Sequence, residues 1–146
     1  MILRVLLASL AGLFAMAEGP KMPPKDIYRV WVHSDEEDTE DFEVYRPESF
    51  DFPPARGRDG FEVKRGGAFV LREIGPADGI EEVDGKWEFK PADALSVTFP
   101  DAKPREILPG EFIAAPGART YRIEGCDEGI LRIRKKAADK SPRRSR

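Results

Sequence analysis

The sequence predicts an all-β protein, an antiparallel up-and-down meander that closes into a β-barrel of about eight strands. Between residues 61 and 133 short segments alternate apolar and polar residues, and each segment ends at glycine, proline or aspartate. The chain of 146 residues contains 13 glycines and 13 prolines, which fall between the apolar runs and mark turns. An open meander has two unpaired edges, and closure into a barrel removes both of them.

The length is that of one domain with a single core. A signal peptide is predicted at the N-terminus because Arg4 precedes a short apolar run that ends in Ala15-Met16-Ala17. The protein is therefore expected to be periplasmic or secreted, or cytoplasmic if Met16 or Met22 is the true start. The expected division of the chain is a signal peptide at 1–17, a lead-in linker at 18–26, a β-barrel domain at 27–134 and a disordered basic tail at 135–146.

The N-terminal part of the domain is expected to hold one strand and two loops. Residues 27–33 alternate around Trp31 and predict the first strand. Residues 35–43 then carry seven carboxylates in nine positions and predict a solvated acidic loop, and an extended piece begins at Phe42. The prolines of residues 46–54 predict an extended loop that follows the surface.

The remaining strands follow in hairpins. Gly66-Gly67 is expected to turn one hairpin, and Asp84-Gly85 is expected to form a type I′ turn in the next. Two weaker strands flank Pro109-Gly110. A final hairpin turns between residues 125 and 129, which gives eight to ten strands in all.

Four motifs lie in the second half of the predicted meander. They are Gly85-Lys86-Trp87-Glu88-Phe89, Leu95-Ser96-Val97-Thr98-Phe99, Tyr121-Arg122-Ile123 and Leu131-Arg132-Ile133. Through these motifs the chain resembles bacterial lipocalin-like domains over roughly residues 60–134, and the resemblance implies a lipocalin-like barrel. Lipocalins place Gly-x-Trp on the first strand, however, and no ligand-binding signature residue transfers from the family. The segment from Tyr45 to Arg58 is similar to small uncharacterised bacterial proteins and implies no activity.

The charge distribution argues against a nucleic-acid or membrane surface on the barrel. The net charge is −3, but residues 132–146 hold eight basic residues and one acid, and residues 18–131 hold 15 basic and 26 acidic residues. An acidic body repels phosphate backbones and anionic lipid. We expect no specific nucleic acid partner and no transmembrane span.

Catalytic groups are scarce in this sequence. His33 is the only histidine, and Ser34 beside it points to the opposite face of a strand, so the two cannot form a nucleophile and base pair. Cys126 is the only cysteine and is expected to be an inert residue in the last hairpin turn, with its thiol pKa raised by neighbouring acids. The sequence predicts a non-enzymatic protein without a cofactor.

Two binding functions remain open. The first is a barrel that binds an apolar or amphipathic small molecule, and the alternative is a solid barrel that acts as a structural or protein-interaction module through the acidic, proline-rich loop at residues 35–54. Calcium is a weaker option, since EF-hand spacing is absent, and its candidate ligands are Asp35, Glu36, Asp38 and Glu40. The candidate ligand-binding residues are Trp31, Phe61, Phe69, Trp87, Phe89, Phe99, Tyr121, Arg56 and Arg58.

Overall fold

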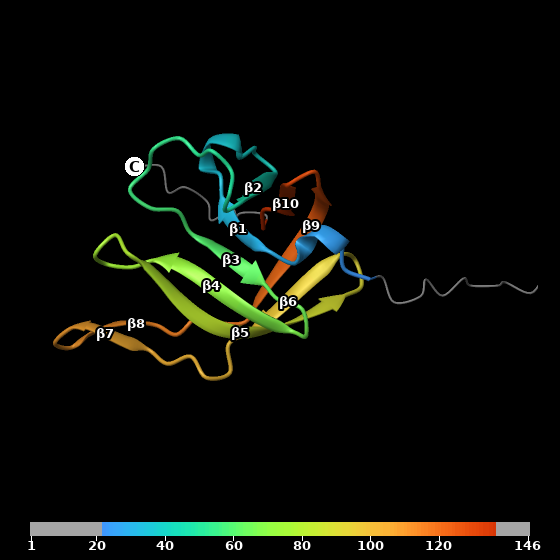
Figure 1. Cartoon of the computed structure of the whole chain (residues 1–146). Coiled ribbons are helices and arrows are strands. Elements are labelled where there is room, and N and C mark those ends of the chain that lie inside the picture. Colours follow the sequence, from blue (N-terminus) through green and yellow to red (C-terminus); the bar gives the residue numbers. More distant parts are fainter. Residues whose placement is uncertain (1–21, 137–146) are drawn as a thin grey trace, which may run out of the picture.

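The computed structural model describes residues 22–136, except for the side chains of residues 106–108 and 111–113. The predicted signal peptide at 1–17 and the tail beyond residue 136 lie outside the described residues. The described chain forms an all-β domain with a closed antiparallel barrel of eight strands, which confirms the predicted fold class (Figure 1). The barrel strands are β1 (Val30–His33), β2 (Phe42–Pro47), β3 (Gly60–Val63), β4 (Ala68–Ile74), β5 (Ile80–Lys90), β6 (Ala94–Thr98), β9 (Arg119–Asp127) and β10 (Ile130–Arg134).

Two further pairs of elements lie outside the barrel wall or at its ends. Strands β7 (Arg105–Leu108) and β8 (Glu111–Ile113) form a separate two-stranded sheet. Two short 3₁₀ turns, η1 (Lys25–Ile27) and η2 (Asp35–Glu37), precede and follow β1. Within residues 22–136, no helix has the length and apolar character needed to cross a membrane.

The order of strands around the barrel is β1, β2, β10, β9, β6, β5, β4 and β3, with β3 pairing back to β1. Strand β1 therefore lies between β2 and β3 and is antiparallel to both. Because β2 and β3 are on opposite sides of β1, the chain needs a long connection between them, and residues 48–59 supply it. This connection is the proline-rich loop that the sequence predicts.

Side chains alternate across the barrel wall as expected. Along β5, Trp87 and Phe89 are partly buried against the core, and Lys86 and Glu88 are exposed. All the remaining barrel strands also contribute residues to the core, so the core fills one continuous interior. Its buried members are Ile27, Trp31, Tyr45, Phe61, Val63, Phe69, Leu71, Leu95, Val97, Phe99, Ile123, Leu131 and Ile133.

The turn predictions have mixed outcomes. Gly66 and Gly67 do turn the β3–β4 hairpin, with φ of 86° and 92°, which glycine adopts without strain. The prediction of a type I′ turn at Asp84-Gly85 is wrong, because strand β5 continues through both residues. Glycine is needed at 85 for another reason: a Cβ there would lie 2.8 Å from the Thr98 carbonyl oxygen and 2.9 Å from the Phe99 ring.

Candidate functional site

The seven aromatic residues predicted to line a cavity all contribute to the core. Trp31, Phe61, Phe69 and Phe99 are buried, and Trp31 donates its Nε1 hydrogen to the Ile27 carbonyl at 2.9 Å. The remaining three, Trp87, Phe89 and Tyr121, are partly buried and pack against this set. Trp87 lies at one end of the barrel, where it donates to the Lys64 carbonyl and meets Tyr28 at 6.0 Å between ring centroids.

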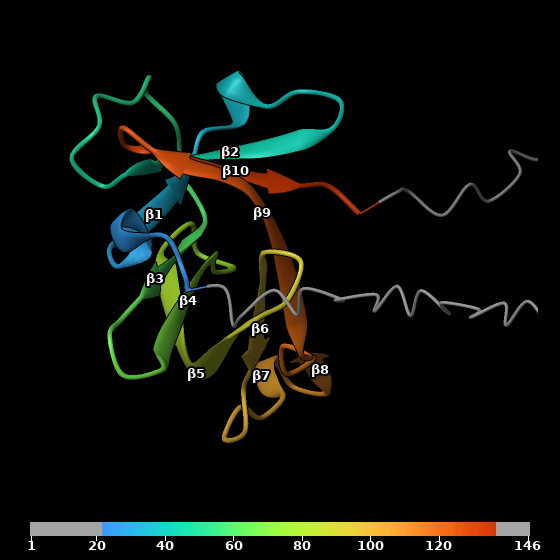
Figure 2. The ribbon, with the colours of Figure 1, turned by 90° about the vertical axis from the view of Figure 1, so that its right-hand side faces the viewer.

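Rings from opposite walls of the barrel touch one another. Strands β3 and β9 are four places apart in the ring of eight, so they face each other across the interior (Figure 2). Phe61 of β3 and Tyr121 of β9 have ring centroids only 5.1 Å apart, and Phe69 of β4 reaches the same Tyr121 at 6.0 Å. At this level the space between the walls is occupied by the protein's own side chains.

A second cluster lies around His33, next to the segment at residues 35–54. The prediction of a continuous loop over this segment is wrong, because the barrel strand β2 runs through its middle, between η2 and the long connection. His33 faces three carboxylates: its Nδ1 lies 2.8 Å from Asp35 and 3.3 Å from Asp59, and its Nε2 lies 3.1 Å from Asp38. Its ring also stacks on Tyr45 at 4.9 Å. This arrangement ties the acidic turn η2 and the end of the connection at Asp59 to the barrel wall.

The carboxylates hold the imidazole in its charged form. The hydrogen bond to Asp59 and then that to Asp38 raise the pKa of His33 to about 9, against the opposing effect of burial. The same contact with His33 lowers the pKa of Asp59. An imidazolium with acids on both nitrogens has no free lone pair, so it cannot serve as a general base.

Two arginines clamp the acidic turn onto the loop. Arg46 pairs bidentately with Glu37, at 2.7 Å from Nε and 2.5 Å from Nη2, and its guanidinium stacks on Phe50 at 4.7 Å. The second arginine, Arg58, repeats the pattern with Glu36 and Phe52. Arg58 is thus a structural anchor in this arrangement, because its guanidinium is paired with Glu36 within the chain.

The two clamps stand side by side. Phe50 and Phe52 meet edge to face at 4.9 Å, which joins one Glu–Arg–Phe stack to the other. Arg58 also donates to the carbonyl oxygens of His33 and Pro53. The 35–54 segment is therefore held in one conformation by charged hydrogen bonds and ring contacts, and it presents Phe50 at the surface.

The predicted calcium ligands do not gather as a set. Donor atoms of His33, Asp35 and Asp38 lie within 4.8 Å of one another, but Glu36 pairs with Arg58 and Glu40 is exposed and outside this group. Each oxygen of Asp38 already accepts hydrogen bonds, Oδ1 from the Val44 amide and Oδ2 from the ammonium of Lys135 at 3.2 Å. These carboxylates have cationic partners within the chain, so a metal ion would have to displace them.

The last two candidate residues, Cys126 and Arg56, have surroundings that do not activate them. Cys126 lies near the end of β9 and not in the turn, and burial, followed by the charge of Asp26, raises the pKa of its thiol to about 11. A thiol of this kind is a poor nucleophile at neutral pH. The last predicted ligand anchor, Arg56, is exposed, and no described residue forms an ion pair with it.

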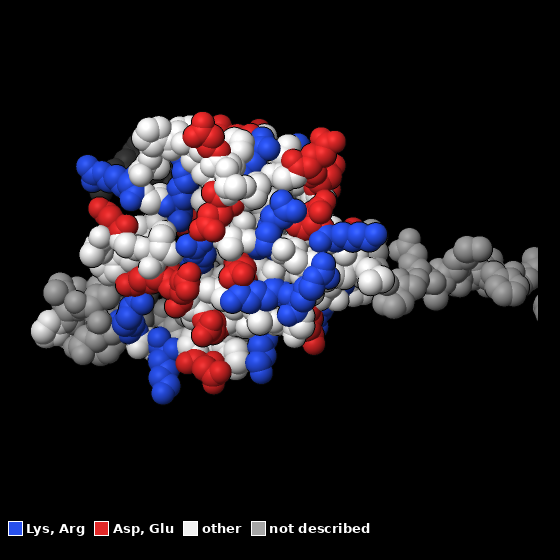
Figure 3. All heavy atoms as spheres, viewed as in Figure 1, with Lys and Arg blue, Asp and Glu red and all other residues white. Residues whose placement is uncertain are grey.

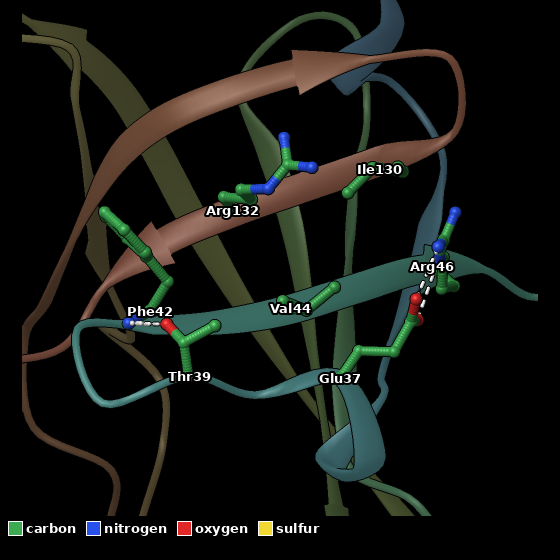
Figure 4. Close-up of a pocket in the computed structure, with 7 residues that line it drawn as sticks. All are labelled: Glu37, Thr39, Phe42, Val44, Arg46, Ile130 and Arg132. Atoms are coloured by element: carbon green, nitrogen blue, oxygen red, sulfur yellow. Dashed lines mark hydrogen bonds and ion pairs between the residues drawn. The ribbon is translucent and has the colours of Figure 1, made fainter.

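A pocket of about 210 Å³ lies on the outer wall, between the 35–54 segment and β10 (Figure 4). Val44 forms its floor, with Ile130 and Arg132 of β10 on one side. Five of the seven lining residues belong to the 35–54 segment, and only the two from β10 do not. The lining residues are Glu37, Thr39, Phe42, Val44, Arg46, Ile130 and Arg132.

Two residues that complete this pocket lie far from the 35–54 segment in the sequence and were not predicted. Ile130 and Arg132 come from the last strand, and the register that sets Arg132 opposite Val44 joins strands about 90 residues apart. One signal was available: Phe42 and Val44 are apolar on the outward face of β2, where solvated polar residues are expected. Outward apolar residues indicate that something covers that face.

Neither a protein-family model, nor a curated protein, nor a solved structure matches this chain.

Proposed function

We propose that this protein is a non-enzymatic binding module whose solid barrel presents the 35–54 segment to a protein partner. The contact between Phe61 and Tyr121 across the barrel carries the proposal, because it places protein atoms where a carrier would hold its ligand. Of the two functions left open by the sequence, this one agrees better with rings that meet between opposite walls. The resemblance to bacterial lipocalin-like domains then extends to the barrel architecture and not to a ligand in the interior.

The outer segment has the properties of a preorganised contact surface. Arg46 and Arg58 restrain it before any partner arrives, which lowers the entropy cost of binding. Phe50 is 37% exposed on this restrained frame, and partly exposed aromatic side chains are frequent anchors of protein interfaces. The face drawn in Figure 3 carries Lys, Arg, Asp and Glu interspersed, so charge alone does not mark a docking surface there.

The same geometry supports a protein without catalysis. His33 is held as an imidazolium by Asp35, Asp38 and Asp59, and the thiol of Cys126 is protonated at neutral pH. The two side chains most often used as base and nucleophile are thereby excluded from those roles.

The proposed location is the periplasm or the extracellular space, based on the signal-peptide pattern in residues 1–17. Mass spectrometry of the protein isolated from its natural host tests this. An N-terminus at Glu18 in the periplasmic or culture fraction supports export, and an intact Met1 in the cytoplasm contradicts it.

A capture experiment with a matched control tests the interaction function. The full chain is immobilised and exposed to a host extract, and a protein identified by mass spectrometry is followed with two variants. Phe50→Ser with Phe52→Ser is expected to abolish capture. Ile74→Ser with Ile80→Ser, which alters two exposed apolar residues at the β4–β5 hairpin, is expected to leave capture intact.

A fluorescent fatty-acid probe tests the competing carrier function on the same preparation. Saturable one-to-one binding that is lost in Trp87→Ala would place the ligand inside the barrel and overturn the proposal. Equal capture by both double-serine variants would also contradict it. Circular dichroism and the thermal midpoint of each variant establish that the barrel is folded.

A further inference from the structure

The pocket over Val44 is a candidate recognition site within the proposed binding surface. It is the place where the 35–54 segment meets β10, and its volume of about 210 Å³ is that of a side-chain site, below the usual range of about 300–1,000 Å³ for whole small-molecule ligands. The pocket is open to solvent on one side, so an extended chain could lie along it.

The floor and walls of this pocket are chemically divided. Val44 is 5% exposed and forms an apolar base, with the side chains of Phe42 and Ile130 beside it. Arg46 and Glu37 form the opposite wall and neutralise each other through their bidentate pair. An aliphatic group could therefore bury against Val44 without removing a lone charge from water.

Arg132 adds to the pocket a positive charge that the Arg46–Glu37 pair does not neutralise. Within residues 22–136 it forms no ion pair, whereas the neighbouring basic groups do: Arg134 pairs with Glu124, and Lys135 pairs with Asp38. Its register partner is Val44, so the two residues are neighbours across β10 and β2, and the Arg132 side chain extends from β10 on the side away from Val44 (Figure 4). The guanidinium lies over β9, where a Cβ built on Gly125 would be in ordinary van der Waals contact with its Nη1 at 3.8 Å.

We propose that this pocket recognises a short segment of a protein partner that carries an aliphatic side chain next to a single carboxylate. The aliphatic group packs on Val44 between Phe42 and Ile130, and the carboxylate pairs with Arg132. The inference rests on the proposed function and specifies the partner's chemistry.

The acidic charge of residues 18–131 limits the partner to one carboxylate. Residues 18–131 hold 15 basic and 26 acidic side chains, so a run of acids in the partner would be repelled by the rest of the barrel. A single acid beside apolar residues gains the contact with Arg132 and adds little to that repulsion.

Titration of the ¹⁵N-labelled full chain with defined peptides tests the proposal. The probe is acetylated and amidated Gly-Leu-Glu-Gly, and its matched forms carry Gln or Lys in place of Glu. Saturable shifts are expected at the amides of Thr39, Val44 and Ile130. The Gln form should bind about fivefold more weakly, since it lacks the charged partner of the guanidinium.

Charge reversal at Arg132 gives the sharpest result. Arg132→Glu should lose the preference for the Glu peptide and bind the Lys peptide more strongly than the Glu peptide. Lys86→Glu makes the same change of net charge on exposed β5, which lies three places from β10 in the ring of strands, and should keep binding of the Glu peptide within about twofold. Arg132→Gln separates loss of charge from reversal and should bind the Glu and Gln peptides equally.

Three results would overturn the proposal. They are equal binding of the Glu and Gln peptides by the wild type, shifts that map away from the pocket, and unchanged binding in Arg132→Glu. Free 4-methylpentanoate, which carries the same two groups in a small molecule, provides a further arm. Tighter saturation of the pocket by this acid than by the peptide would replace the peptide partner with a small-molecule ligand.

The capture experiment and the peptide titration test the interaction function and the pocket inference separately. If the captured partner depends on Phe50 and Phe52 but the peptides do not bind, the pocket inference fails and the interaction function stands. If the peptides bind as expected but no partner is captured by the full chain, the interaction function fails and the pocket remains a site for the chemistry described.

Discussion

The barrel interior and the 35–54 segment are held together by different forces. Inside, Phe61, Phe69 and Tyr121 meet through ring contacts that depend on close packing. Outside, Arg46 and Arg58 hold the segment through ion pairs that water and salt can reach. Stability is therefore concentrated in the interior, where pH and salt have little effect on the ring contacts. The outer segment is held by ion pairs, which changes of pH or salt can weaken.

Removal of an interior ring has the largest expected effect. Phe61→Ala deletes a 1% exposed ring that contacts Tyr45, Phe69 and Tyr121, and it should lower the free energy of unfolding by about 3–5 kcal/mol. Urea denaturation monitored by tryptophan fluorescence measures this. The control Phe50→Ala, at the surface, should cost far less, and equal losses would contradict the distinction between the two regions.

The His33 cluster predicts a pH dependence of stability. The pKa of His33 in the folded protein is about 9, above the unfolded value of 6.5, so its contribution is complete below pH 6.5 and is lost as pH rises through 9. The wild type should lose up to about 3 kcal/mol across that interval. His33→Gln should be less stable at pH 6 and lack this slope, and a parallel pH profile of the two proteins would refute the assignment.

A methyl group at Gly85 tests the packing of β5 against β6. Gly85→Ala would bring a Cβ to 2.8 Å from the Thr98 carbonyl oxygen, and the expected loss is about 1–3 kcal/mol, because backbone must shift. Gly79→Ala is the matched control, since no atom lies within 4 Å of the added methyl group. Thermal unfolding of the two variants should therefore differ, and equal midpoints would argue for a local turn at residues 84 and 85.

Loss of one outer clamp has the smallest expected effect. Arg46→Met should cost about 0.5–1 kcal/mol, because its pair with Glu37 and its contact with Phe50 are partly exposed to water. Limited proteolysis should nonetheless cleave the parts of the 35–54 segment on either side of β2 faster in the variant, while the barrel strands stay intact. Molar salt should narrow the difference between the two proteins, and cleavage at the same rate in both would show that the clamp does not restrain the segment.

The sequence predicts the local features of the fold and misses those that depend on distant partners. Alternation along residues 86–90 identifies the inward Trp87 and Phe89, because side-chain direction in a strand is a local property. The position of β1 between β2 and β3 depends on which hydrogen-bonding edges meet, and alternation carries no information about that. Gly85 is misread for a related reason, since the ring that requires it comes from Phe99 on another strand.

For the candidate site, too, local features could be predicted from the sequence and contacts between distant residues could not. The acidic, proline-rich composition at residues 35–54 draws attention to the segment that supplies five of the seven residues lining the outer pocket. The partner of Arg58 is Glu36, 22 positions away, and local sequence patterns do not identify a partner at that separation. The contribution of Arg132 could not be predicted without the pairing of the last strand with β2.

The central claim is that side chains from opposite walls meet inside the barrel. Nuclear Overhauser effects between the ring protons of Phe61 and Tyr121 in the full chain measure this contact directly. The 5.1 Å between the ring centroids predicts strong cross-peaks that persist when a fatty-acid probe is added. The absence of those cross-peaks, or their disappearance on addition of the probe, would contradict the account and indicate an interior open to a ligand.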